Sequence, residues 1–185
     1  MNIVLMIGWE EIIMRQIRKG TFETNSSSCH SICIQRAPVK MRDHITFRIG
    51  EYGWEIGCVE NTASYLYTAI LDGFNDKEKE ERLEKLKSIL DSHSITYDMY
   101  DEDHWCGLDH ACEARRFVDA LLNDEDLLFR FLFGQDSCVW TGNDNGCEDE
   151  NMCFCADDKI RNWNGEYIDN PNHDKEKFEY FYKGN

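Results

Sequence analysis

Four segments with helical periodicity follow one another between residues 63 and 133, and β-prone segments lie on both sides of them. The predicted helices cover about Ala63–Asp72, Asp76–Ser92, His110–Leu122 and Glu125–Phe133. This order predicts an α+β fold in which about four helices pack on a small, mainly antiparallel sheet. A chain of 185 residues with two prolines favours one compact domain.

Local signals place the ends of these helices. Thr62 is the predicted cap of the first helix, Asp124 is that of the fourth, and Gly134 ends the fourth. Oppositely charged side chains at i,i+4 are expected to support the second helix through two pairs, Glu78 with Arg82 and Glu81 with Lys85.

The β-prone segments are short and flank the helices. Alternation of apolar and polar residues or β-branched content marks His30–Gln35, His44–Ile49, Ser94–Met99, Ser137–Thr141, Met152–Ala156, Ile160–Ile168 and Phe178–Lys183. In His44–Ile49 the residues Ile45, Phe47 and Ile49 share one face, as in a half-buried strand.

The net charge of -16 is distributed unevenly. Residues 1–50 carry seven Lys or Arg and four acids, so the remaining 135 residues carry a balance of -19. Such a surface repels nucleic acid and membranes and favours a basic protein partner. The clusters expected to bind it are Asp101, Glu102 and Asp103; Asp124, Glu125 and Asp126; and Glu148, Asp149 and Glu150.

These carboxylates have two interpretations. A solvated face is the ordinary explanation of a charge run. Phosphate mimicry is the sharper one, because carboxylates on a rigid scaffold fit a Lys/Arg-lined groove made for nucleic acid. Trp105, Trp140 and Trp163 lie among the acids and are candidate interface anchors.

Nine cysteines are present, without a preceding secretory signal or a run long enough to span a membrane. We therefore expect a cytoplasmic protein with thiols rather than disulfides. Zinc is possible but not required, and its first candidate ligands are Cys138, Cys147, Cys153 and Cys155. A second set is His104, Cys106, His110 and Cys112. The alternatives are buried thiols for the first set and an acidic loop before a helix for the second.

A hydroxyl-rich run precedes a histidine near the N-terminus. Ser26, Ser27 or Ser28 as nucleophile and His30 as base would make a hydrolase if an acid oriented the ring. The alternative is a turn in which the Asn and Ser side chains bond their own backbone.

The segment from Arg18 to Ser31, RKGTFETNSSSCHS, resembles a signature of small acidic proteins from bacteriophages and mobile elements of Firmicutes. The resemblance rests mainly on Thr24, Asn25, Ser26, Ser27, Ser28 and His30, and Cys29 stands where that family usually has Thr. It favours Met14 as the natural start, with 1–13 as a possible extension and 14–185 as the acidic domain.

A small acidic mobile-element protein also resembles type II-A anti-CRISPR inhibitors. The resemblance implies a non-enzymatic function, namely binding of an RNA-guided effector nuclease with its guide RNA and block of target DNA binding or cleavage. A zinc-supported structural protein of a phage and a hydrolase built on His30 are the alternatives.

Overall fold

The computed structural model describes residues 28–53, 57–59, 61–101, 107–109, 111–143, 158–161, 164–171 and 173–183. Their helices are α1 (Thr62–Gly73), α2 (Asp76–Ser92), the 3-10 turn η1 (Ala111–Ala114), α3 (Arg115–Asn123) and α4 (Glu125–Phe133). The strands are β1 (Ser28–Gln35), β2 (His44–Arg48), β3 (Glu51–Tyr52), β4 (Gly57–Val59), β5 (Thr96–Tyr100), β6 (Gly107–Leu108), β7 (Cys138–Asn143), β8 (Lys159–Arg161), β9 (Tyr167–Asp169) and β10 (Phe178–Lys183).

The main sheet has four antiparallel strands in the order β10-β1-β7-β4, so it joins both ends of the described chain. In its register Ile32 lies opposite Phe181 on one side and Val139 on the other. Ile32 and Val139 are fully buried in the hydrophobic core. The strand β1 is therefore an inner strand of the main sheet rather than an edge strand.

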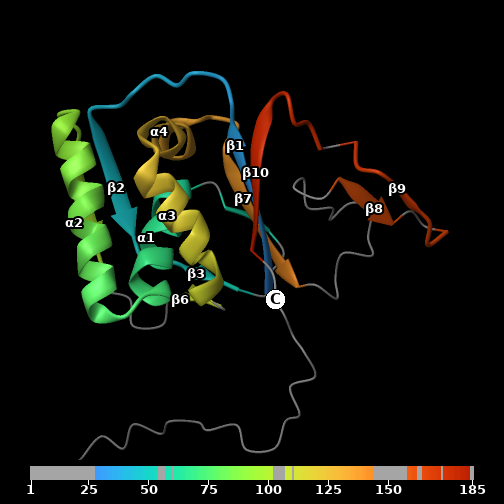
Figure 1. Ribbon diagram of the computed structural model, residues 1–185, viewed down its shortest axis with the longest axis horizontal. Helices are drawn as coiled ribbons and strands as arrows, with labels where there is room; N and C mark the ends of the chain where they lie inside the picture. Colours follow the sequence, from blue (N-terminus) through green and yellow to red (C-terminus); the bar gives the residue numbers. More distant parts are fainter. Residues whose placement is uncertain are drawn as a thin grey trace, which may run out of the picture.

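The helices α1, α3 and α4 lie between this sheet and a smaller parallel pair, β2–β5, whereas α2 lies at the left edge of the view, beyond β2 (Figure 1). The helix α1 packs on β2 and also contacts α2, α3 and α4. Its Tyr65, Leu66 and Ile70 are fully buried. Two more pairs complete the described structure: β3–β6 is parallel and β8–β9 is antiparallel.

The α+β class, the four helices and the mainly antiparallel main sheet are confirmed. The predicted bounds of the second and fourth helices agree with α2 and α4, and Phe178–Lys183 agrees with β10. The predicted strand Met152–Ala156 lies outside the described residues.

The structure corrects the predicted cap of the first helix. Asn61 caps α1, since its side chain accepts a hydrogen bond from Ser64 N. Thr62 instead donates its hydroxyl to the carbonyl of Phe131 at 2.8 Å. A hydroxyl one residue inside the helix is thus used to fasten α1 to α4.

The predicted charge pairs within α2 are also wrong. Arg82 extends to α3, where its Nε and Nη2 donate to the two carboxylate oxygens of Asp119 at 3.0 and 3.2 Å. Glu78 forms a capping box with Asn75. A bidentate partner on the neighbouring helix offers Arg82 a better geometry than a carboxylate one turn away on its own helix. For the other predicted pair, Lys77 bonds Glu81 and Lys85 bonds Asn123.

No helix within the described ranges is both long and apolar enough to cross a membrane.

Candidate functional site

The acidic cluster at the start of α4 is held in a fixed orientation. Asp124 caps the helix by accepting from Leu127 N at 3.1 Å. Glu125 lies 2.9 Å from Nε2 of His93, and Asp126 accepts from Nε of Arg130 at 2.8 Å. The side chains of Glu125 and Asp126 remain 55% and 80% exposed. Each carboxylate therefore keeps oxygen surface for a partner.

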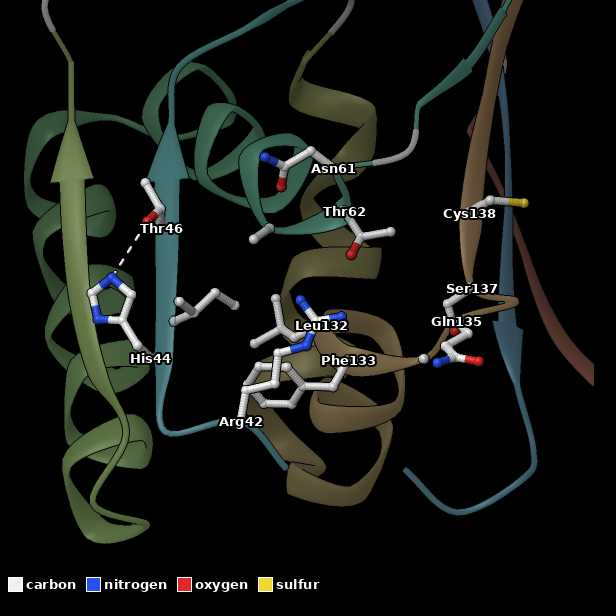
Figure 2. A pocket seen from close by; sticks show the side chains of 13 residues that line it. Arg42, His44, Thr46, Asn61, Thr62, Leu132, Phe133, Gln135, Ser137 and Cys138 are labelled. Atoms are coloured by element: carbon white, nitrogen blue, oxygen red, sulfur yellow. Dashed lines mark hydrogen bonds between the residues drawn. The ribbon is translucent and has the colours of Figure 1, made fainter. Parts of the chain in front are cut away.

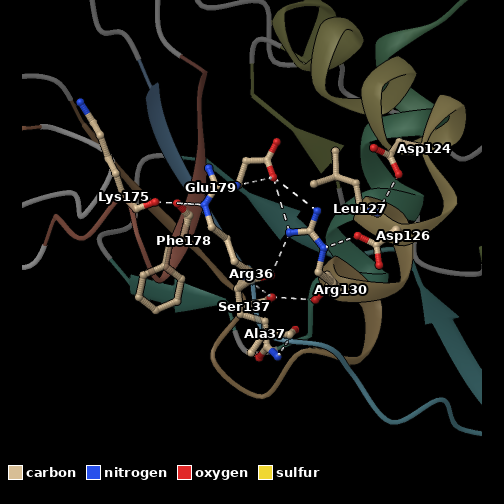
Figure 3. A network of polar contacts seen from close by, with 11 residues as sticks. Arg36, Ala37, Asp124, Asp126, Leu127, Arg130, Ser137, Lys175, Phe178 and Glu179 are labelled. Atoms are coloured by element: carbon tan, nitrogen blue, oxygen red, sulfur yellow. Dashed lines mark hydrogen bonds and ion pairs between the residues drawn. The ribbon is translucent and has the colours of Figure 1, made fainter.

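Arg130 is the buried anchor beneath this cluster (Figure 3). Its Nη1 donates to the carbonyl of Gln35 at 3.0 Å, and its guanidinium also reaches Glu179 of β10. Ser137 closes the arrangement by donating its hydroxyl to the carbonyl of Arg130 at 2.7 Å and accepting from Gln35 N. The network links α4 to β1 and β10 and so fastens this helix to the main sheet.

The other two predicted acidic clusters are only partly described. Asp101 is exposed just after β5. Glu102, Asp103, Glu148, Asp149 and Glu150 lie outside the described residues. Asp124–Asp126 is consequently the predicted acidic cluster that the structure describes in full.

The β8–β9 hairpin presents an exposed aromatic surface that the sequence analysis missed. Tyr167 is 71% exposed and Ile168 is 42% exposed. Asp158, Glu166 and Asp169 are exposed nearby in the sequence, and Lys159 pairs with Asp169 across the two strands. The β-prone pattern of Ile160–Ile168 predicts strands but carries no signal of which face stays in solvent. Of the predicted anchors, Trp140 is half-buried in β7, and Trp105 and Trp163 lie outside the described residues.

His30 belongs to the core rather than to an open cleft. Its side chain is fully buried on β1, and Nδ1 lies 2.8 Å from the hydroxyl of Tyr65. Burial, and to a smaller extent the nearby Tyr52, raises the pKa of Tyr65 far above its ordinary value. Ser28 begins β1, whereas Thr24, Asn25, Ser26 and Ser27 lie outside the described residues. The structure thus gives His30 a core contact, and the hydrolase alternative stays a prediction.

Only one member of each predicted set of zinc ligands, Cys138 or Cys112, lies within the described residues, so both sets stay predictions. Cys138 is half-buried and lies directly opposite Cys33 in the β1–β7 register. Cys147, Cys153, Cys155, His104, Cys106 and His110 lie outside the described residues, and Cys112 is exposed. No group of three or more His, Cys, Asp or Glu within the described ranges is arranged to hold a metal ion.

A cavity of about 770 Å³ separates β2 from the Cys138 end of β7 (Figure 2). The first turn of α1 and the last turn of α4 also line it, through Asn61, Thr62, Leu132 and Phe133. A second cavity of about 570 Å³ adjoins it, because Arg42, Phe133 and Gln135 line both. The volumes of both cavities lie within the range of ligand-binding clefts.

No protein-family model, curated protein or solved structure matches this chain. Its function is therefore argued from the described surfaces.

Proposed function

We propose that this protein is a non-enzymatic inhibitor that occupies the cationic nucleic-acid-binding surface of its partner, and that the partner is an RNA-guided type II CRISPR effector nuclease. The observation that carries the proposal is the acidic end of α4. Three consecutive carboxylates, Asp124–Asp126, are exposed there and held by a cap, a histidine and a buried arginine.

Rigid carboxylates suit this task better than mobile ones. A carboxylate that is already oriented loses little conformational freedom when it meets an arginine, so more of the interaction energy appears as affinity. The DNA channel of such a nuclease is basic, and arginines read the short motif beside the target. Asp124–Asp126 would compete with DNA phosphates for those side chains.

The β8–β9 hairpin supplies a complementary kind of contact. Tyrosine is enriched among the residues that dominate binding energy, and Tyr167 offers its ring to solvent beside acids. Apolar area from Tyr167 and Ile168 would add affinity that salt does not screen. The acids would speed association and set the orientation of the complex.

The decisive experiment measures target-DNA binding by a purified type II effector–guide RNA complex, with and without this protein, at low and high salt. Direct association with loss of DNA binding is the expected result, and both effects should weaken as salt rises. Direct association without loss of DNA binding would move the proposed block to the cleavage step. Absence of association with several such effectors would overturn the proposal.

A charge-neutral variant makes the test specific to the acidic end of α4. The triple substitution Asp124→Asn, Glu125→Gln and Asp126→Asn keeps a side chain that caps the helix while it removes three charges. We expect affinity to fall by about tenfold or more, as for contacts between charged groups at an interface. The matched control removes three exposed charges elsewhere, through Glu51→Gln, Glu80→Gln and Glu176→Gln. Equal losses of affinity in both variants would mean that the total negative charge, rather than the position of the carboxylates on α4, determines binding.

A further inference from the structure

Strand β2 has one edge that is paired and one that is not. On the paired edge, Thr96 N donates to the carbonyl of Asp43 at 2.9 Å and Ile49 N donates to the carbonyl of Tyr100 at 3.0 Å. In a parallel ladder the backbone groups of alternate residues point to the same neighbour. The backbone N–H and C=O groups of the odd-numbered residues of β2 therefore point to β5, and those of the even-numbered residues point away from it.

The opposite edge is satisfied over only part of its length. Two hydroxyls of α1 accept from even-numbered residues there: Ser64 Oγ from Arg48 N at 3.2 Å, and Thr68 Oγ1 from Gly50 N at 2.9 Å. Within the described part of the chain, nothing accepts from the backbone N–H of His44 or Thr46. These two residues line the 770 Å³ cavity (Figure 2). The open stretch of the edge thus faces the cavity.

The cavity wall combines apolar side chains with a cation. Ile45, Ala63, Leu132 and Phe133 are apolar, and Arg42, which lies beside Phe133 in Figure 2, is the arginine that lines it. No Asp or Glu lines this cavity among the described residues, although the whole chain has 36. No hydrogen bond or ion pair joins the Arg42 side chain to the rest of the described structure. In a protein of net charge -16, such an arginine is a local site for a carboxylate.

We propose that this edge binds an extended, acidic peptide segment of another protein by strand addition. The peptide backbone would pair with His44 and Thr46, which is the usual source of affinity when a strand is added to a sheet edge. Its side chains would alternate, with apolar residues toward Leu132 and Phe133 and a Glu or Asp toward Arg42. The open stretch from His44 to Thr46 covers three residues of β2, or about 10 Å at the rise of a strand.

The adjoining cavity limits where the acid can lie. It adds Lys40 to Arg42, but Asp43 and Asp136 line it as well. The formal charges that line this second cavity therefore sum to zero, whereas Arg42 also lines the 770 Å³ cavity, where no Asp or Glu is present among the described residues. This site attracts anionic chains, whereas the acidic end of α4 attracts cationic ones, so the inference does not depend on the proposed function.

The test uses two labelled hexapeptides, blocked at both ends, in which valine alternates with glutamate or with lysine. Fluorescence anisotropy with the full chain is expected to show binding of the glutamate peptide and at least tenfold weaker binding of the lysine peptide. Amide resonances of His44 and Thr46 should shift on titration with the glutamate peptide. Arg42→Glu should weaken its binding by about tenfold or more.

The control variant is Arg116→Glu, which makes the same change at an exposed arginine of α3 outside the cavity. Binding of the glutamate peptide should be unchanged in Arg116→Glu. The inference is overturned if the glutamate peptide does not bind, if both peptides bind equally, or if both variants weaken binding equally. It is also overturned if sedimentation shows a dimer that excludes the peptide, because a second copy would then occupy the edge.

Discussion

Arg130 and Tyr167 differ in burial in the opposite sense to what their residue types lead one to expect. Arg130 is charged and only 8% exposed, whereas Tyr167 is aromatic and 71% exposed. Arginine is seldom buried without partners, and Arg130 has them on α4, β1 and β10. The hairpin of Tyr167 is formed by two strands of three residues each. The helix–sheet body thus holds even a charged side chain in place through buried contacts, while the hairpin leaves aromatic area in solvent.

The largest effect is expected from Arg130→Met. The substitution keeps most of the side-chain volume but leaves the carbonyl of Gln35 and the carboxylate of Glu179 without this donor. Loss of one member of a buried charged network costs about 3 kcal/mol of unfolding free energy. Urea unfolding followed by circular dichroism measures it. Arg130→Lys should lose less, and a loss under about 0.5 kcal/mol in Arg130→Met would show that the network is not a source of stability.

A second large effect concerns alkaline pH and Tyr65. Burial holds the pKa of Tyr65 above its unfolded value, so the folded protein keeps a proton that the unfolded chain releases above about pH 10. The resulting stability is complete below that pH and falls as pH rises, by up to about 1.4 kcal/mol per pH unit. Urea unfolding between pH 9 and about pH 11 measures the slope.

Tyr65→Phe is the control for this pH dependence. It removes the titrating hydroxyl and also the contact with His30, so stability at neutral pH should fall while the alkaline slope becomes shallower. An unchanged alkaline slope would contradict a role for Tyr65. The raised pKa of Tyr67, due first to burial, leaves a residual slope in the variant.

A smaller effect is expected at the cap of α4. Asp124→Ala removes the acceptor for Leu127 N and should cost about 1 kcal/mol of unfolding free energy. Asp124→Asn retains a capping oxygen and should cost little. Thermal unfolding of the two variants gives the comparison, and equal destabilisation would mean that charge rather than capping dominates at this position.

The smallest effect on stability, and a clear one on binding, is expected from Tyr167→Ala. An exposed side chain away from the core changes unfolding free energy by less than about 0.5 kcal/mol. Affinity for the effector complex should nevertheless fall if the hairpin is a contact surface. Tyr100→Ala, at a 38% exposed tyrosine on β5, is the matched control. A marked loss of stability in Tyr167→Ala would contradict the view that the exposed side chains of the hairpin contribute little to the free energy of unfolding.

The helices were predictable because their signals are local. The leucines of α2, the cap Asp124 and the terminal Gly134 act within a few residues, and α2 and α4 have the predicted bounds. The half-buried face of β2 was predictable for the same reason, since Ile45 and Phe47 alternate with polar residues and are buried.

The pairing of these elements and the partners of their polar groups depend on the tertiary fold. The sequence does not show that β1 lies between β10 and β7, nor that β2 and β5 are parallel, because pairing depends on contacts far apart in the chain. The sequence predicted an ion pair between Arg82 and Glu78, yet Arg82 pairs with Asp119 of α3 in a bidentate geometry. The open edge at His44 and Thr46 also arises only in three dimensions, since the hydroxyls of Ser64 and Thr68 accept from Arg48 and Gly50, and that of Thr62 donates to Phe131 instead. Composition and local periodicity thus predicted an acidic α+β protein, whereas packing determined which backbone groups and side chains stay accessible.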